Sequence, residues 1–295
     1  MKFSVARAGA GLHLRIEPAD WPVPVRDHLR MAICERNSRV TAPAGMLIVC
    51  CPLGGRVDLA AGECVMPLGR GDIYVGDAHV PHELAVADRG AALAIAGSAQ
   101  AWSALGSEAA RVARPANVLF PALHRGKRTL VRQFLRFARR CAEAGDGVAG
   151  RHLAQRLAEL VDVLQADFAA MIARCPGASP VRKRAVFLRL QRVRNHIAAC
   201  AHRDLDVASL ALMANYSVGH FITTFRSVFA ETPYSSVSRY RLESASDLLT
   251  AGELGIADIA HSIGFQSRSS FNRAIKRRLG VSASQYRENL REAQG

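Results

Sequence analysis

Residues 205–221 of the chain read LDVASLALMANYSVGHF, and residues 256–271 read IADIAHSIGFQSRSSF. Each stretch places apolar residues at helical spacing, interrupts them with a short turn, and then resumes the helical spacing. Two short amphipathic helices joined by a turn are typical of the helix-turn-helix motif. Because the same pattern recurs about fifty residues later, the sequence predicts an internal duplication.

Both copies have the residue types that a close crossing of two helices requires. Ala211 and Ala260 are small residues at the position where the second helix would cross the first. Four residues later stand Asn215 and Gly264, and Gly and Asn are the residue types that most readily adopt a positive φ. The sequence therefore predicts a left-handed turn in each copy.

The second helix of each copy is predicted to begin at a serine and to bury one face. The side chains of Ser217 and Ser267 can accept hydrogen bonds from the first N–H groups of these helices, whose N-termini can then face a phosphate group. The predicted buried stripes are Phe221, Phe225 and Phe229 in the first copy and Phe271, Ile275 and Leu279 in the second.

Residues 234–250 lie between the two copies and contain no Gly or Pro. A helix of about 16 residues spans roughly 24 Å at 1.5 Å per residue. A rigid rod of that size can hold two recognition helices about one DNA turn apart, near 34 Å, in successive major grooves. This arrangement predicts that the C-terminal part binds double-stranded DNA.

The charge of the chain is distributed unevenly. Residues 1–110 of the 295-residue chain have 10 basic and 11 acidic side chains, a net charge of −1. Residues 111–180 have 12 basic and 5 acidic side chains, and residues 181–295 have 17 and 9, so their net charges are +7 and +8 within a total of +14. A positive helical part beside a neutral module favours a polyanion as the partner of the helical part.

The cellular compartment is predicted from the absence of membrane-spanning and export segments in the sequence. No apolar run reaches the length needed to span a membrane, and Arg7 interrupts any N-terminal segment that could serve as an export signal. We therefore expect a cytoplasmic protein without membrane contact. The 7 cysteines form no C-x-x-C pair, and the adjacent Cys50 and Cys51 are interpreted as reduced thiols that pack as small apolar residues, with a redox switch as the alternative.

The first 110 or so residues are predicted to be rich in β-strands. Short apolar stretches bounded by Gly, Pro and Asp occur at residues 12–16, 46–50, 57–59, 73–75 and 93–96. Several short strands at this spacing suggest a sandwich or a barrel.

From about residue 123 the apolar spacing becomes helical. Apolar residues at positions 130, 134, 137 and 141, and again at 153, 157, 160, 164 and 168, predict two amphipathic helices joined by a glycine-rich loop. The stripe is interpreted either as the internal packing of a helical hairpin or as a dimer interface, because a narrow Leu stripe suits pairing between subunits. Residues 175–180, CPGASP, then predict a linker, because Pro and Gly interrupt helices.

Residues 241–249, RLESASDLL, and residues 256–287, IADIAHSIGFQSRSSFNRAIKRRLGVSASQYR, carry a longer signature. With the duplicated pattern, this signature resembles the DNA-binding domain of the AraC/XylS family of bacterial transcription regulators. The resemblance covers residues of roughly 186–292, over a third of the chain. It implies a sequence-specific regulator of transcription, with activation as the commoner role.

The resemblance also implies which residues of the second copy read bases. These positions fall on Arg268, Ser269, Ser270, Asn272 and Arg273, and all five side chains can form hydrogen bonds. Arg can bond guanine through two hydrogen bonds, and Asn can do the same with adenine.

In the first copy the implied base-reading positions have a different chemistry. They fall on Gly219, Ile222 and Thr223, with Ser217 and His220 nearby. Long polar side chains are missing there, but Ile222 and Thr223 can contact thymine methyl groups. Outside the base-reading positions, Lys276 is expected to contact phosphate. Ala230 occupies the position at which the family has a helix-ending Gly.

Residues 71–83, GDIYVGDAHVPHE, resemble the second motif of cupin-like β-barrels. The resemblance implies a barrel module in which His79, His82 and Tyr74 are the candidate residues of an effector pocket. The H-x-H of the first cupin motif is absent upstream, and His79, His82 and Glu83 cannot easily surround an ion from one strand and turn. We therefore expect no metal, no cofactor and no catalytic residues.

Together these features predict an α+β protein with two domains. Residues 1–115 would form a cupin-like β-rich sensor, 116–175 a helical hairpin for dimerisation, 176–185 a linker and 186–295 a double helix-turn-helix domain. The expected partners are double-stranded DNA, a small-molecule effector, RNA polymerase and a second copy of the chain. Two alternatives stay open: a cupin-type metalloenzyme with a helical appendage, and a regulator whose first copy contacts polymerase instead of bases.

Overall fold

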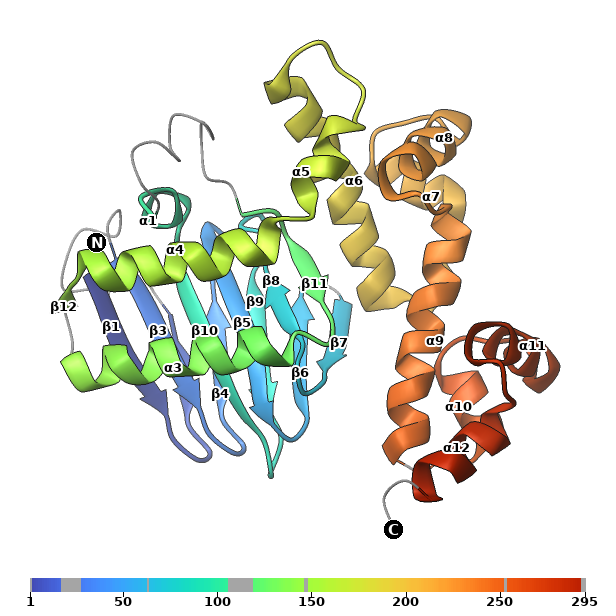
Figure 1. The fold of residues 1–295 in the computed structure, drawn as a ribbon, viewed down its shortest axis with the longest axis horizontal. Helices are drawn as coiled ribbons and strands as arrows, with labels where there is room; N and C mark the ends of the chain where they lie inside the picture. The colour runs from blue at the N-terminus through green and yellow to red at the C-terminus, as the bar shows by residue number, and fades with distance from the viewer. Residues whose placement is uncertain are drawn as a thin grey trace. The chain divides into compact units, whose positions relative to one another are not determined.

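The computed structural model describes residues 2–16, 28–62, 64–105, 119–145, 148–251 and 254–292. The chain forms two compact units, Met1–Ala170 and Met171–Gly295, which we call the N-terminal and C-terminal units. Figure 1 shows that the first is rich in β-sheet and that the second is helical. The predicted boundary between residues 115 and 116 lies outside the described residues, and the division between the units falls inside the predicted segment 116–175.

The N-terminal unit contains two β-sheets. The larger sheet has seven strands in the order β11-β8-β5-β10-β3-β1-β12, and the smaller has five in the order β2-β4-β9-β6-β7. The strands are β1 (Lys2–Ala8), β2 (His13–Arg15), β3 (His28–Cys34), β4 (Arg39–Ala42), β5 (Met46–Gly54), β6 (Val57–Ala61), β7 (Cys64–Leu68), β8 (Ile73–Val75), β9 (His82–Val86), β10 (Ala91–Ser98), β11 (Ala122–His124) and β12 (Val148–Ala149).

The two sheets do not close into one barrel. In the part of the chain that the structure describes, no hydrogen-bonded ladder joins a strand of one sheet to a strand of the other. The prediction of a closed barrel is therefore wrong, and the two-sheet arrangement agrees with the sandwich alternative. The larger sheet is an open layer, because its edge strands β11 and β12 pair with no strand of the smaller sheet among the described residues, and helices cover one of its faces (Figure 1).

The helical hairpin is the layer that covers this sheet. Helices α3 (Arg128–Ala144) and α4 (Arg151–Gln165) lie across the sheet, and the short helix α1 (Ala99–Ser103) packs into the same core. Phe134, Phe137, Cys141, Leu157 and Leu164 are buried there. The predicted apolar stripe therefore packs internally, as one of the two interpretations stated.

The C-terminal unit is built from helices. They are α6 (Pro180–Cys200), α7 (Val207–Met213), α8 (Val218–Phe229), α9 (Pro233–Ala251), α10 (Ile256–Ser262), α11 (Arg268–Leu279) and α12 (Ala283–Glu292), and the short α5 (Phe168–Ala173) spans the division between the units. Helix α6 begins at Pro180, inside the predicted linker 176–185, because Ser179 caps it and Pro suits the first position of a helix.

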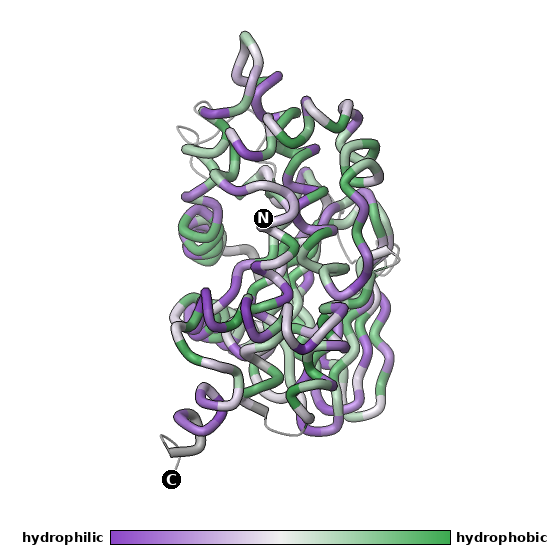
Figure 2. Tube along the Cα trace, turned by 90° about the vertical axis from the view of Figure 1, so that its right-hand side faces the viewer, coloured by the Kyte–Doolittle hydropathy of each residue, from purple (hydrophilic) through white to green (hydrophobic). Residues whose placement is uncertain are grey.

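Helices such as α3 and α8 bury one apolar face and expose the other. Figure 2 shows the trace alternating between hydrophilic and hydrophobic residues, as elements with one buried face require. Among the described residues, no helix combines the length and the apolar composition that crossing a bilayer demands.

Cys50 and Cys51 lie on β5 and both are buried and free. Burial, with the nearby Cys34, raises the pKa of the Cys51 thiol to about 12. Because the thiolate is the reactive form of cysteine, this environment favours the interpretation of both residues as small apolar side chains over a redox switch.

Helices α8 and α11 both end in the left-handed conformation, but with different residues. Ala230 has a φ of 58° and Gly280 has a φ of 79°, and each N–H donates to the carbonyl four residues earlier. Gly adopts this conformation at no steric cost, whereas for Ala the Cβ atom crowds the backbone.

We therefore predict that Ala230→Gly stabilises the protein by about 1 kcal/mol. The reciprocal control is Gly280→Ala, which should destabilise by a similar amount, because an added Cβ atom would meet no atom within 4 Å and only the backbone would respond. Urea unfolding of the full chain, followed by the helical circular dichroism signal, measures both. A lower urea midpoint for Ala230→Gly than for the wild type would contradict a strained left-handed conformation at Ala230.

Candidate nucleic-acid interface

The two helix pairs α7–α8 and α10–α11 have turns of the same construction. The N–H of Tyr216 donates to the carbonyl of Ala211 at 3.0 Å, and the N–H of Phe265 donates to that of Ala260 at 2.9 Å. The N–H groups of Asn215 and Gly264 donate to carbonyls three residues earlier. Each first helix thus ends in a Schellman motif, which satisfies its last carbonyl groups.

The predicted left-handed residues are found at both turns. Asn215 has a φ of 58° and Gly264 a φ of 88°. At Gly264 a side chain is also excluded by space, because a Cβ atom would lie 2.5 Å from the carbonyl oxygen of His202. Ala211 and Ala260 are buried, as expected of small residues at the crossing point of two helices.

The second helix of each pair buries one face and exposes the other. In α8 the rings of Phe221, Phe225 and Phe229 are buried and stack edge to face, with centroids 5.5 Å and 4.7 Å apart. In α11 Phe271 and Ile275 are buried, and Leu279 is half-buried. The predicted stripes therefore hold the helices by one face and leave the opposite face outside.

The serines before the two helices behave differently. The hydroxyl of Ser267 accepts from the N–H of Ser270 at 3.2 Å, so the predicted cap of α11 is present. Ser217 occupies the equivalent backbone position of α8, but its side chain forms no capping bond, and that prediction is wrong. The backbone carbonyl of Ser217 still accepts from the N–H of Phe221 at 2.8 Å, so the helix begins there without help from the hydroxyl.

The outer face of α11 presents long donors. Arg268, Ser269, Arg273 and Lys276 are exposed, and Asn272 is half-buried. Within the described residues, no hydrogen bond or ion pair engages the side chains of Arg268 and Arg273. The hydroxyl of Ser270 is engaged, because it donates to the carbonyl of Ser267 at 2.8 Å. The predicted base-reading residues thus lie together on one surface, with Ser270 turned back to the cap.

The corresponding face of α8 presents small or apolar side chains. Ser217, Gly219, His220, Ile222 and Thr223 are all exposed. The structure therefore brings the predicted residues of the first copy together as well, without the charged donors of α11.

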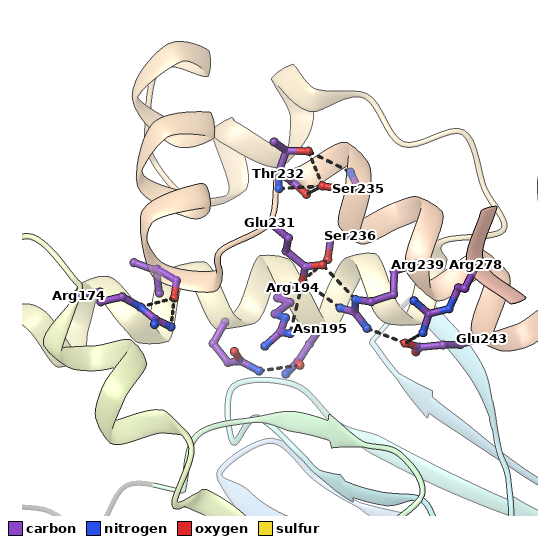
Figure 3. Close-up of polar contacts among 12 residues, drawn as sticks. Arg174, Arg194, Asn195, Glu231, Thr232, Ser235, Ser236, Arg239, Glu243 and Arg278 are labelled. Carbon is purple, nitrogen blue, oxygen red and sulfur yellow. Dashed lines mark hydrogen bonds and ion pairs between the residues drawn. The ribbon is translucent and has the colours of Figure 1, made fainter. Parts of the chain in front are cut away.

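Helix α9 joins the two pairs through a polar network that sequence reasoning missed. Glu231, in the turn after α8, accepts two hydrogen bonds of 3.0 Å from the Arg239 guanidinium and one of 3.1 Å from Ser236 (Figure 3). Arg194 of α6 lies 3.4 Å from the same carboxylate. Arg239 also donates to Glu243 at 2.9 Å, and Arg278 of α11 lies 3.7 Å from Glu243. The network links α6, the end of α8, α9 and α11.

The helix that follows each pair begins with a reciprocal cap. The N–H of Thr232 donates to the hydroxyl of Ser235, which returns its N–H to the hydroxyl of Thr232 (Figure 3). Ser282 and Gln285 repeat this arrangement fifty residues later, at the start of α12. The signal for these caps was present in the sequence, as a hydroxyl residue followed three positions later by Ser or Gln.

A groove of 1320 Å³ runs between the two helix pairs along α9. Residues from the start of α7, from α9 and from α10–α11 line it. Its cationic side chains are Arg239, Arg241, Arg273, Arg277 and Arg278, and its one carboxylate is Asp204. Such a lining attracts an anionic backbone.

The predicted effector residues of the N-terminal unit do not gather as a group. Tyr74 and His82 are buried, and the Tyr74 hydroxyl lies 3.4 Å from Nε2 of His82. His79 is exposed, and its Nδ1 atom lies 2.8 Å from Asp77. Burial lowers the pKa of His82 to about 4, so the imidazole is neutral at physiological pH.

A cavity of 460 Å³ opens on the smaller sheet beside His82. His82, His13, Arg15, Thr41 and Glu83 supply its polar lining. Glu83 is also paired with Arg39 at 3.2 Å. The cavity therefore includes one of the three predicted effector residues, with Tyr74 behind it and His79 outside it.

Comparison with known proteins bears on the C-terminal unit. A family model described as a helix-turn-helix domain matches residues 210–289. The RCS-specific HTH-type transcriptional activator RclR of Escherichia coli (strain K12) is 36% identical over 86 residues, which cover 29% of this chain and 30% of that protein. The MmsAB operon regulatory protein of Pseudomonas aeruginosa is 24% identical over 126 residues, 43% of this chain and 40% of that protein. The chain thus matches less than half the length of these relatives.

Solved structures also match parts of the chain. The DNA-binding domain of AdpA, in complex with a target DNA, is 28% identical and matches 36% of this chain and 95% of its own, with a TM-score of 0.35. ToxT from Vibrio cholerae O395 matches 89% of this chain and 97% of its own, at 11% identity and a TM-score of 0.35.

The helix pairs, the basic outer face of α11 and the matched family model define the C-terminal unit as a DNA-binding domain of the helix-turn-helix class. This domain is of the AraC type, as the sequence resemblance implied.

The Glu231 network gives a prediction for the pH dependence of stability. Burial alone would raise the pKa of Glu231, but the hydrogen bond from Arg239 and the charges of Arg239 and Arg194 outweigh it, so the pKa lies below the ordinary value of 4.5. A lowered carboxylate pKa stabilises the fold above the pKa of the unfolded chain, and this contribution disappears as the pH falls through the lower, folded-state pKa.

We therefore expect Glu231→Gln to destabilise the protein by about 2 kcal/mol at pH 7. The difference from the wild type should persist down to about pH 4.5 and shrink below it. Urea midpoints measured from pH 7 to pH 3 test this, with Glu159→Gln as a control that removes an exposed carboxylate. A stability difference between the wild type and Glu231→Gln that grows on acidification would contradict a lowered pKa of Glu231.

Proposed function

We propose that the protein is a sequence-specific regulator of transcription in which both helix pairs act as helix-turn-helix units. Helices α8 and α11 would enter successive major grooves of one duplex. The observation that carries the proposal is the outer face of α11, where Arg268 and Arg273 are exposed and engaged by no other described side chain or carbonyl. Two free guanidinium groups on a capped recognition helix suit guanine edges in a major groove.

The spacing of the pairs supports simultaneous docking. Helix α9 has 19 residues and so spans about 28 Å, close to the 34 Å turn of B-DNA that separates adjacent contacts on one face. The groove, lined by the start of α7, by α9 and by α10–α11, presents cationic side chains beside α11. These cations would supply the sequence-independent, salt-dependent part of the affinity.

In this proposal the N-terminal unit senses a small molecule and the chain acts as an activator. The 460 Å³ cavity beside His82 has the size of a small-ligand site. A ligand there could change transcription only by binding the active and inactive states unequally. RNA polymerase and a second copy of the chain are the further proposed partners, and the copy cannot use the Leu157 and Leu164 stripe, because these residues are buried in the core.

The metalloenzyme alternative lacks comparable support. His79 is paired with Asp77 and Glu83 with Arg39, so these two side chains of the 71–83 segment are directed to other partners. Metal analysis of the purified protein distinguishes the two functions, since bound iron, nickel or zinc in a one-to-one ratio would favour the enzyme.

The test of the proposed function compares two substitutions on α11. Arg273→Ala should weaken binding to the selected operator by about 1–3 kcal/mol and relax selection at one base pair. Lys276→Ala should weaken all sequences alike and lower the salt dependence by about one ion. Selection of bound fragments from genomic DNA, followed by affinity measurements at several salt concentrations, provides both readouts. Unchanged affinity and footprint for Arg273→Ala would refute the base-reading role.

A further inference from the structure

Two polar groups on the outer face of α8, those of Thr223 and His220, are engaged within the helix and its turn. The hydroxyl of Thr223 donates to the carbonyl of Gly219 at 3.0 Å. The Nε2 atom of His220 lies 3.4 Å from the hydroxyl of Thr224, and the His220 ring packs edge to face on Tyr216, with centroids 4.6 Å apart. A hydroxyl that donates to its own helix is not free to donate to a base edge.

Beside these two groups the face exposes apolar side chains. Val218 is 43% exposed and Ile222 is 36% exposed. Gly219 lies between them in the sequence, and a Cβ atom added there would meet nothing within 4 Å. Because Gly219 has no side chain, the surface of α8 can approach a groove floor closely. The face therefore offers methyl groups and backbone.

The major groove of DNA contains one apolar group on its base edges, the 5-methyl group of thymine. We propose that α8 selects thymine at its half-site through methyl contacts from Ile222, Val218 and Thr223, while α11 selects its half-site through hydrogen bonds. The proposal rests on the proposed function, because it assigns the sequence class that one of the two reading helices takes.

DNA is favoured over a protein partner by the place of α8 in the duplication. Fifty residues separate Ser217 from Ser267 and Phe221 from Phe271, so Ile222 corresponds to Asn272 and Thr223 to Arg273. The apolar face of α8 thus occupies the position that holds the long donors in α11. The N–H groups of the first turn of α8 also lack a side-chain cap, which leaves them available to phosphate beside the groove.

The experiment replaces thymine by deoxyuracil, which has the same hydrogen-bonding edge and lacks only the methyl group. The full-length chain first selects its operator, and Arg273→Ala identifies the half-site of α11 by loss of selection there. Deoxyuracil in the other half-site should weaken binding about fourfold for each contacted methyl group, the factor that corresponds to one buried methylene. The same replacement at thymines within the half-site of α11 should leave affinity unchanged.

Ile222→Ala makes the test specific to this residue. The variant should bind the natural operator several-fold more weakly and should lose the deoxyuracil penalty at the position that Ile222 contacts. Leu212→Ala is the matched control, because Leu212 is 79% exposed on α7 and lies outside the α8 face. This control should keep both the affinity and the penalty.

Three other outcomes have defined meanings. Protection of both half-sites with no deoxyuracil penalty would overturn the methyl readout and leave the proposed function standing. Unchanged DNA affinity for Ile222→Ala, with reduced transcription in a purified polymerase assay, would overturn it in favour of a protein contact. Failure of the chain to select any site would overturn the proposed function, and the methyl readout with it.

Discussion

The left-handed turn between paired helices is the constraint on which the reading surface depends. At Asn215 and Gly264 a positive φ reverses the chain while the Schellman hydrogen bonds satisfy the end of the first helix. Only then can the second helix cross over Ala211 or Ala260 and bury its apolar stripe. The orientation of the exposed face of α8 or α11 is a consequence, because a helix fixed along one face has no freedom to rotate the other.

The Glu231 network extends this local constraint to the whole C-terminal unit. Arg239 connects the carboxylate that follows α8 to Glu243, which approaches Arg278 on α11. Because Glu231 and Arg239 are largely shielded from solvent, their attraction is screened less than that of surface pairs. The two helix pairs are thus held against one stiff helix, which the proposed docking of α8 and α11 on a single duplex requires.

The sequence predicted the elements whose signals are local. Positive-φ residues, the Ser267 cap, the buried stripes and the uninterrupted helix α9 were all readable from spacing and residue type. The Ser217 cap was not, because a serine at a helix start can leave its hydroxyl unused. The closed barrel failed for a non-local reason, since no pattern within a strand reports that helices α3 and α4 cover the sheet. The Glu231 network includes pairs far apart in the sequence, such as Arg194 with Glu231 and Glu243 with Arg278, and has no sequence signature.

Comparison of the two copies separates what holds the fold from what reads DNA. The crossing alanines, the serines before α8 and α11, the first stripe phenylalanines and the reciprocal caps at Thr232 and Ser282 correspond in residue type. On the outer face, Ile222 and Thr223 stand where the second copy has Asn272 and Arg273. If both exposed faces read DNA as proposed, two alike scaffolds with different faces favour different chemistry in each groove. We therefore expect an asymmetric site that is bound in one direction, because reversing the duplex would set guanidinium groups against methyl groups.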